Sequence, residues 1–308
     1  MHDLKAIYDK VRDCILFTSK QYFVNGENTR FYPRKPKMSD LEVICLSITA
    51  ECTQIDSENL LWSKIQKDYP NMFKNLCHRT KFNKRRKLLN PVMSQILEAT
   101  SALLHDHSGD TTLVIDSMPI PTCKLARERT SLACRDIKKD EVLANKGKNI
   151  IMGGWFIGYK LHLITTLSGV YKDFMISSAS VHDNTYLKFI NETDTHLHNH
   201  NLLADRGYVG QAVQLSLFEN YQINLKIPYK CNQKDFKKYP YELKIQRKTI
   251  EVVFAQYCDE FRIKINYAKR FEGFFTRITT KICAKTFKQY LNLINGRPIN
   301  QTKHSLAA

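Results

Sequence analysis

Three acidic residues that lie far apart in the sequence occupy positions from which they could act together. Asp116 ends the apolar run in LVIDSMPIP and Asp205 ends the one in LLADRGYVG, so we expect both carboxylates at the ends of strands. Glu251 lies in the amphipathic stretch RKTIEVVFAQY, which predicts a helix. A sheet with a helix packed on it would bring the three carboxylates together.

Converging carboxylates repel one another unless cations bind between them, and hard oxygen ligands favour Mg²⁺ or Mn²⁺. In phosphodiester cleavage, two such ions about 3.5–4 Å apart activate the attacking oxygen and stabilise the leaving oxygen. We assign Asp116 as the ligand that bridges two ions, with Asp205 on one ion and Glu251 on the other. Each residue also has a simpler explanation, since both aspartates could form turns and Glu251 could be an exposed helical acid.

The segments that would position these residues alternate between strand and helix from about residue 110 onwards. Residues 111–121, 154–169 and 170–181 are rich in β-branched and apolar residues, and a turn at 167–170 joins the last two into a hairpin. Helical sequence then alternates with the short strands LLAD and INLKIP, and Glu251 lies on the last helix. This order predicts an α/β layer with a mixed sheet. Residues 123–150 are predicted to be a polar loop that contacts substrate, and Trp155 and Phe156 are expected in the core.

The first hundred residues predict helices. In KPKMSDLEVICLSITAE, Ser39 can act as an N-cap and Glu42 completes a capping box. Further along, six basic residues fall within nine positions without an acidic neighbour, which favours a phosphate-contacting element like a helix-turn-helix over a solvated helix face. They are Arg79, Lys81, Lys84, Arg85, Arg86 and Lys87.

The composition favours a polyanionic partner. The chain has 308 residues, 47 basic against 30 acidic side chains and a net charge of +17, with a pI of about 9.4. The hydrophobic fraction of 43% is typical of a globular protein. No run is long and apolar enough to span a membrane and the start of the chain does not resemble a signal peptide, so we expect a cytoplasmic protein. Nine scattered cysteines without a CxxC pair indicate reduced thiols and no structural zinc site.

The motifs together resemble DDE-type transposases of bacterial insertion sequences, which have an RNase H-like catalytic core. The resemblance covers nearly the whole chain and rests on IDSMPIP, GYKLHL, VHDNTYL, ADRGYVG and RKTIEVVF. Asp116 matches the first aspartate of the family. Asp205 matches the second, which a basic residue, a glycine and a tyrosine follow. Glu251 matches the glutamate, with Arg247 four residues before it.

The resemblance implies a fold, a reaction and partners. We expect a helical DNA-binding domain at 1–108, an RNase H-like catalytic domain at 109–297 and a flexible tail at 298–308. Water would cleave the ends of the element to free 3′-hydroxyls, which would then attack target DNA. The partners would be the terminal inverted repeats and a target duplex, bound by a homodimer or larger assembly near the nucleoid.

Further basic residues are candidates for contact with DNA. Lys160 alternates with apolar neighbours on a predicted strand, and Arg206 and Arg247 accompany two of the acids. The basic stretch 226–248 leads directly to Glu251 and is a candidate track for phosphates.

The chain departs from related families at two positions, because Lys244 replaces a tyrosine often found three residues before the arginine and Cys258 replaces a lysine seven residues after the glutamate. Three alternatives to a transposase stay open. An RNase H-like nuclease would use the same carboxylates without joining DNA, and an inactive or repurposed copy would bind DNA without cleaving it. A glycosidase with paired carboxylates is disfavoured by the basic charge.

Overall fold

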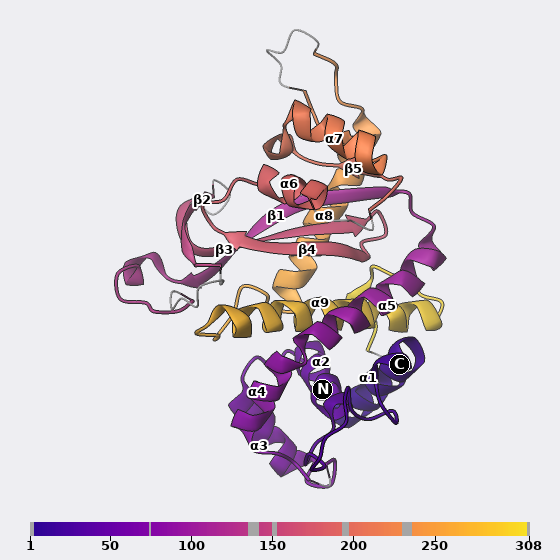
Figure 1. Cartoon of the computed structure of the whole chain (residues 1–308), viewed down its shortest axis with the longest axis vertical. Helices are drawn as coiled ribbons and strands as arrows, with labels where there is room; N and C mark the ends of the chain where they lie inside the picture. Colours follow the sequence, from indigo (N-terminus) through magenta and orange to yellow (C-terminus); the bar gives the residue numbers. More distant parts are fainter. Residues whose placement is uncertain are drawn as a thin grey trace. The chain divides into compact units, whose positions relative to one another are not determined.

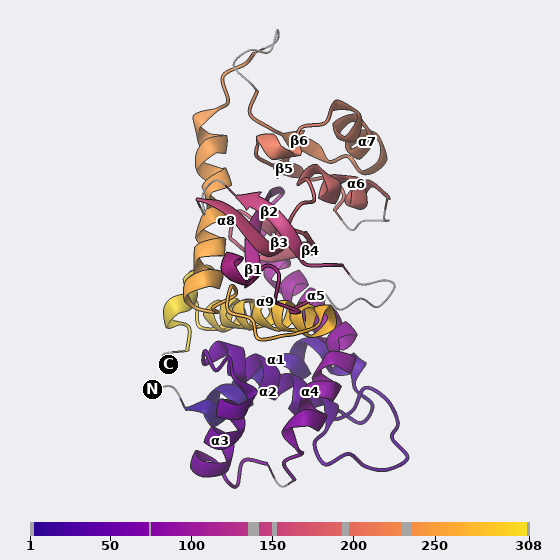
Figure 2. The same cartoon turned by 90° about the vertical axis from the view of Figure 1, so that its left-hand side faces the viewer.

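The computed structural model describes residues 3–73, 75–134, 142–149, 153–192, 197–229 and 236–306. Its contacts divide the chain into two compact units (Figures 1 and 2). The helical unit comprises Met1–His107, Gln256–Ala268 and Glu272–Ala308, and the α/β unit comprises Ser108–Ala255 and Lys269–Phe271. The first division falls beside the predicted boundary at 108/109. Beyond residue 255, however, most of the chain groups with the helical unit and not with the predicted catalytic domain.

The helical unit confirms the predicted N-terminal helices. They are α1 (Leu4–Ser19), α2 (Asp40–Cys52), α3 (Glu58–Asp68), α4 (Arg79–Leu88) and α5 (Asn90–Ser108), joined by α9 (Phe271–Ile294) and the 3₁₀ helices η1 (Lys20–Tyr22) and η4 (Thr302–His304). The predicted capping box begins α2: the Ser39 hydroxyl accepts a hydrogen bond from the Glu42 backbone N–H, and the Glu42 carboxylate accepts one from Ser39. These bonds satisfy two backbone donors that a helix start would otherwise leave unpaired.

The end of the chain differs from the flexible tail predicted at 298–308. Within the described residues, Thr302 and Ser305 are almost completely buried. The Asn292 amide on α9 donates hydrogen bonds to the carbonyls of Pro298, Ile299 and Gln301. Residues 298–305 are therefore held against α9 within the helical unit.

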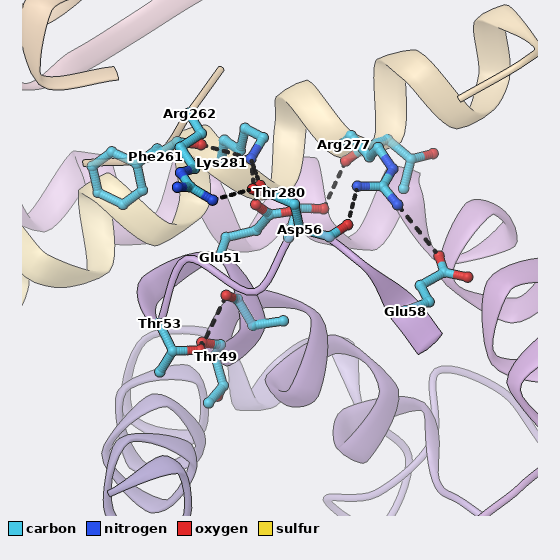
Figure 3. A network of polar contacts seen from close by, with 12 residues as sticks. Thr49, Glu51, Thr53, Asp56, Glu58, Phe261, Arg262, Arg277, Thr280 and Lys281 are labelled. Carbon is cyan, nitrogen blue, oxygen red and sulfur yellow. Dashed lines mark hydrogen bonds and ion pairs between the residues drawn. The ribbon is translucent and has the colours of Figure 1, made fainter. Parts of the chain in front are cut away.

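A buried ion network joins α9 to the loop after α2 (Figure 3). The Lys281 ammonium is fully buried and lies 2.5 Å from a carboxylate oxygen of Glu51 and 3.3 Å from one of Asp56. The Arg277 guanidinium donates to the Asp56 carbonyl at 3.0 Å and lies 3.9 Å from the Glu58 carboxylate. The charges of Lys281 and Arg277 can be buried because each meets an opposite charge.

The α/β unit is built on one six-stranded sheet in the described residues. Its strands are β1 (Thr112–Cys123), β2 (Asn145–Asn149), β3 (Gly154–Thr166), β4 (Tyr171–Ser178), β5 (Asn201–Leu203) and β6 (Asn224–Lys226). β1 runs antiparallel along one edge of β3, while β2 and β4 share the other edge of β3 in succession. β5 pairs parallel with β1, and β6 pairs parallel with β5.

This arrangement confirms the predicted fold class, an α/β protein with an RNase H-like mixed sheet. β1, β3 and β4 form the antiparallel meander, and the turn at 167–170 closes with hydrogen bonds between Thr166 and Val170 and between Gly169 and Thr166. The prediction of a polar loop at 123–150 was wrong for β2. This strand was missed because its sequence, NKGKN, lacks the apolar alternation that is typical of a strand. Residues 135–141 and 150 of that loop lie outside the described residues.

Helices cover both faces of the sheet (Figures 1 and 2). They are α6 (Asn184–Glu192), α7 (Gln211–Tyr221) and α8 (Tyr241–Asp259), with the 3₁₀ helices η2 (Leu125–Arg127) and η3 (Arg206–Tyr208). Leu113 and Ile115 of β1 pack in one core cluster with residues of α6 and α7. Side chains alternate along a strand, so Asp116 points to the opposite face, which α8 crosses.

The two tryptophans of the chain lie in different units. Trp62 on α3 is buried, and its indole N–H donates to the Cys77 carbonyl at 3.1 Å. Trp155 on β3 is 53% exposed and lies beside the Lys146 ammonium. The expectation of a core position was therefore wrong for Trp155, although Phe156, on the opposite face of the strand, is buried.

Candidate active site

The register of the sheet places Asp116 and Asp205 side by side. Leu113 pairs with Leu202 and Val114 with Leu203 in the parallel ladder between β1 and β5. Asp116 and Asp205 each follow two residues after the last of these pairs, and residues at the same register of neighbouring strands point to the same face. Asp205 follows the end of β5 as predicted. Asp116 does not end its strand, because β1 continues to Cys123 through its antiparallel pairing with β3.

The Asp116 carboxyl lies in a surrounding that disfavours its negative charge. Burial raises its pKa to about 7, with smaller contributions in the same direction from the charges of Asp205 and Asp183. The Ser117 backbone N–H donates to Asp116 at 2.7 Å, and this bond and the charge of Arg247 act in the opposite direction. Local protein charges therefore only partly compensate an ionised Asp116.

Asp205 is fixed by the turn that follows β5. Its carboxylate accepts the backbone N–H of Gly207 at 2.7 Å and caps the short helix η3. A Cβ atom at position 207 would come within 3.0 Å of an Asp205 oxygen and 3.3 Å of an Asp183 oxygen. Gly207 thus lets two carboxylates approach the same point of the backbone.

Asp183, which follows β4, is a third acid at this place. Its carboxylate lies 3.0 Å from the Lys160 ammonium and accepts a hydrogen bond from the Ser117 hydroxyl at 2.9 Å. The negative charges of Asp116, Asp183 and Asp205 all raise the pKa of the buried Tyr208 hydroxyl, after the larger effect of burial itself. The three aspartates therefore all lie close enough to act on the Tyr208 hydroxyl. The available sequence signal was that Asp183, like Asp205, follows a strand.

Glu251 is linked to the three aspartates indirectly, by its ion pair with Arg247. It is one helical turn after Arg247 on α8, and the two side chains form an ion pair at 3.5 Å. Ile250 and Val253 are fully buried, whereas the Glu251 side chain is 55% exposed. In the described part of the chain, Arg247 is the ion-pair partner of Glu251. The structure thus brings Asp116, Asp183 and Asp205 together and links Glu251 to them by an arginine.

The donor atoms fit a hard divalent cation, but the present geometry does not enclose one. Carboxylate oxygens on neighbouring strands, with the pKa of Asp116 raised in part by its acidic neighbours, are suited to Mg²⁺ or Mn²⁺. Among the residues that the structure describes, no group of three or more histidine, cysteine, aspartate or glutamate side chains is arranged to hold a metal ion.

The basic residues predicted to contact DNA fall into two sets. Several are engaged in the fold: Arg85 with Asp40, Arg86 and Arg79 with Glu58, Lys87 with Glu272, and Lys160 with Asp183. Arg86 is buried, so the interpretation of its guanidinium as a phosphate contact does not fit its position. Lys81, Lys84 and Arg206 are exposed, and within the described residues they form no ion pair.

Comparison with known families agrees with this geometry. A family model described as the transposase DDE domain matches residues 107–287, more than half of the chain. The chain therefore belongs to the DDE transposase family. No curated protein and no solved structure matches it. A search of the described residues for a helix long and apolar enough to cross a membrane found none.

Proposed function

We propose that this chain is the DNA transposase of an insertion sequence. It hydrolyses the ends of the element to free 3′-hydroxyls and joins them to target DNA. The observation that carries the proposal is that Asp116 and Asp205 each lie two residues beyond the parallel ladder between β1 and β5, in a chain that belongs to a DDE family. The net charge of +17 supports double-stranded DNA, in the form of terminal inverted repeats and target, as the partner.

Asp116, Asp205 and Glu251 are the proposed ligands of two divalent ions, Mg²⁺ or Mn²⁺. Such ions, when bound, supply an activated oxygen and stabilise the leaving group. The carboxylates contribute by being ionised, and bound positive charge lowers the pKa of Asp116 from its raised value. The side chain of Glu251 lies next to Arg247, so a change of rotamer could exchange the arginine for a metal ion.

Two basic side chains, Arg247 and Lys160, position the acidic residues and the DNA in this proposal. Arg247 lies close enough for its charge to oppose the burial that raises the pKa of Asp116, and it would bind a DNA phosphate once Glu251 turns away. Lys160 donates to the Val181 carbonyl at 2.9 Å and to Asp183, so it orients Asp183 and is a positioning residue. A homodimer or larger assembly in the cytoplasm would hold the two ends of the element together.

The test is a cleavage and joining assay. The purified chain is incubated with a labelled duplex that carries the end of the element, a target plasmid and Mn²⁺, beside Asp116→Asn. Metal-dependent nicks and joined products that are absent in the variant support a transposase. Nicks without joined products favour an RNase H-like nuclease, and binding without nicks favours a non-catalytic DNA-binding protein. The ion pair that occupies Glu251 is the observation in favour of the last alternative.

Metal binding can be measured without DNA. At about 100-fold excess over its dissociation constant, an ion that binds only the folded state stabilises it by about 2.7 kcal/mol. We expect Mn²⁺ to raise the unfolding temperature of the native chain and to have little effect on Asp116→Asn with Asp205→Asn. Equal shifts in both proteins would contradict the assignment of these ligands.

A further inference from the structure

A large cavity opens beside Asp205 in the α/β unit. It has a volume of about 950 Å³ and is bounded by η3, by the segment that precedes α8 and by the first two turns of α8. Asp205 and Arg206 form one wall, and Tyr241, Lys244 and Arg247 form the wall on α8. The cavity thus extends from the candidate active site along α8.

The charge of the cavity favours an anion. Of the described residues that line it, four are basic, namely Arg206, Lys238, Lys244 and Arg247, and one is acidic, Asp205. Arg206, Lys238 and Lys244 are exposed and form no ion pair within the described part of the chain. Phosphate groups can therefore bind these three side chains without breaking an existing ion pair, whereas Arg247 is paired with Glu251.

The cavity also offers aromatic surfaces. Tyr241 is the first residue of α8 and is 74% exposed, although its ring is large and mostly apolar. Ile245, which is 50% exposed, lies one turn further on the same helix face. Tyr239 is partly buried, and its hydroxyl donates to the Lys226 carbonyl at 3.5 Å, which orients the ring. Exposed rings next to unpaired cations are the usual components of a site for unpaired nucleic acid.

Arg247 connects this cavity to the carboxylates. It lines the cavity and forms the ion pair with Glu251, and its positive charge partly opposes the burial that raises the pKa values of Asp116 and Tyr239. A strand whose phosphates follow Lys238, Lys244 and Arg247 would reach Asp205 at the end of the cavity.

We infer that this cavity binds an unpaired DNA strand next to the bond that is cleaved. The phosphates bind to the four basic side chains, and bases stack on Tyr241 and Tyr239. Paired bases present their edges and not their faces, so stacking on these rings requires a strand that has separated from its complement. The inference rests on the proposed function and specifies the form of the substrate at the site.

The test measures binding to unpaired and paired DNA without cleavage. A labelled oligothymidine of about 12 nucleotides, in the size range of single-strand sites, and a duplex of the same length are titrated in EDTA with Tyr241→Ala, Tyr241→Phe and Tyr267→Ala. Tyr267 is a matched control because it is 66% exposed and lies in the helical unit. The expected result is a loss of roughly 5- to 150-fold for the single strand in Tyr241→Ala, from about 1–3 kcal/mol of stacking per base. Tyr241→Phe, Tyr267→Ala and the duplex should change less than about twofold on the same scale.

A second variant tests the phosphate contacts. Lys238→Gln with Lys244→Gln should reduce the salt dependence of single-strand binding by about 0.7 for each lysine. Unchanged single-strand affinity in Tyr241→Ala, or an equal loss for the duplex, would overturn the inference. The cleavage assay on the same proteins separates the two proposals. If the native protein nicks DNA but Tyr241→Ala binds the single strand normally, the proposed role of the cavity is refuted and the proposed enzymatic function is not. If the native protein binds the single strand through Tyr241 but never nicks DNA, the proposed enzymatic function is refuted and the proposed role of the cavity is not.

Discussion

The ion network around Lys281 in the helical unit and the group of aspartates in the α/β unit are two different arrangements of buried charge. In the helical unit, the fully buried Lys281 lies between Glu51 and Asp56, so its positive charge meets opposite charges at short distances. In the α/β unit, the charges of Asp183 and Asp205 add to burial in raising the pKa of Asp116 to about 7. Balanced buried charges hold elements together, whereas like charges kept close are costly to the fold and typical of functional sites. The difference separates residues that maintain the structure from those that we expect to do chemistry.

The strongest test of this contrast is Asp116→Asn. The variant keeps the shape of the side chain and removes a charge that its neighbours repel. We expect the rate of cleavage to fall at least about 10³-fold. This loss corresponds to the several kcal/mol of transition-state stabilisation that metal ions supply. Stability in metal-free buffer should stay equal or rise. A variant that unfolds at a clearly lower temperature would show that Asp116 has a structural role.

The corresponding change in the helical unit is Lys281→Met. It leaves Glu51 and Asp56 buried without their shared cation, which should lower the free energy of unfolding by about 3–5 kcal/mol. Urea denaturation measures this effect. The control is Lys5→Met, which breaks an ion pair with Asp9 whose side chains are about half exposed, and should cost about 0–1 kcal/mol. Equal losses of unfolding free energy in the two variants would show that burial does not determine how much an ion pair contributes to stability.

The pH dependence of stability tests a buried cation of the helical unit whose charge its neighbours compensate only in part. Burial lowers the pKa of Lys285 on α9 to about 7, while the charge of Glu260 opposes the shift. Between about pH 7 and pH 10 the unfolded chain then holds a proton at this lysine that the folded chain has released. This difference makes stability rise with pH by up to about 1.4 kcal/mol per unit. Lys285→Met should remove this rise, and a pH profile of the unfolding free energy that is the same in the variant would refute the assignment.

The smallest expected effect concerns the surface of α4. Lys81→Ala with Lys84→Ala removes two exposed cations without an ion pair and should lower the salt dependence of duplex binding by about 0.9 for each phosphate that the variant no longer neutralises. Stability should not change. Lys20→Ala with Lys37→Ala, also exposed, is the control. An identical salt dependence in both double variants would exclude α4 from DNA binding.

The elements that local sequence determines were predictable. The capping box of α2 and the meander of β1, β3 and β4 follow from the spacing of residues within a few positions of one another. The positions of Asp205 after a strand and of Glu251 on a helix were predictable for the same reason. Local rules sufficed because each of these features is complete within one segment.

The features that depend on distant partners were not predictable. The six basic residues around α4 looked like one charged surface, but Arg85 meets Asp40 and Arg86 meets Glu58, both far away in the sequence. The interior position of Asp116 depends on a strand that begins 38 residues later, and no local pattern shows it. Asp183 joins the site through Lys160 and Ser117 on two other strands.

The placement of one tryptophan in each unit provides two built-in optical reporters. Indole emission depends on contact with water, so the buried Trp62 should emit at shorter wavelength than the half-exposed Trp155. Because the chain contains two tryptophans, Trp155→Phe leaves a signal from the helical unit alone and Trp62→Phe one from the α/β unit alone. Denaturation curves of the two single-tryptophan proteins would coincide if the units unfold as one cooperative block. They would separate if each unit melts independently.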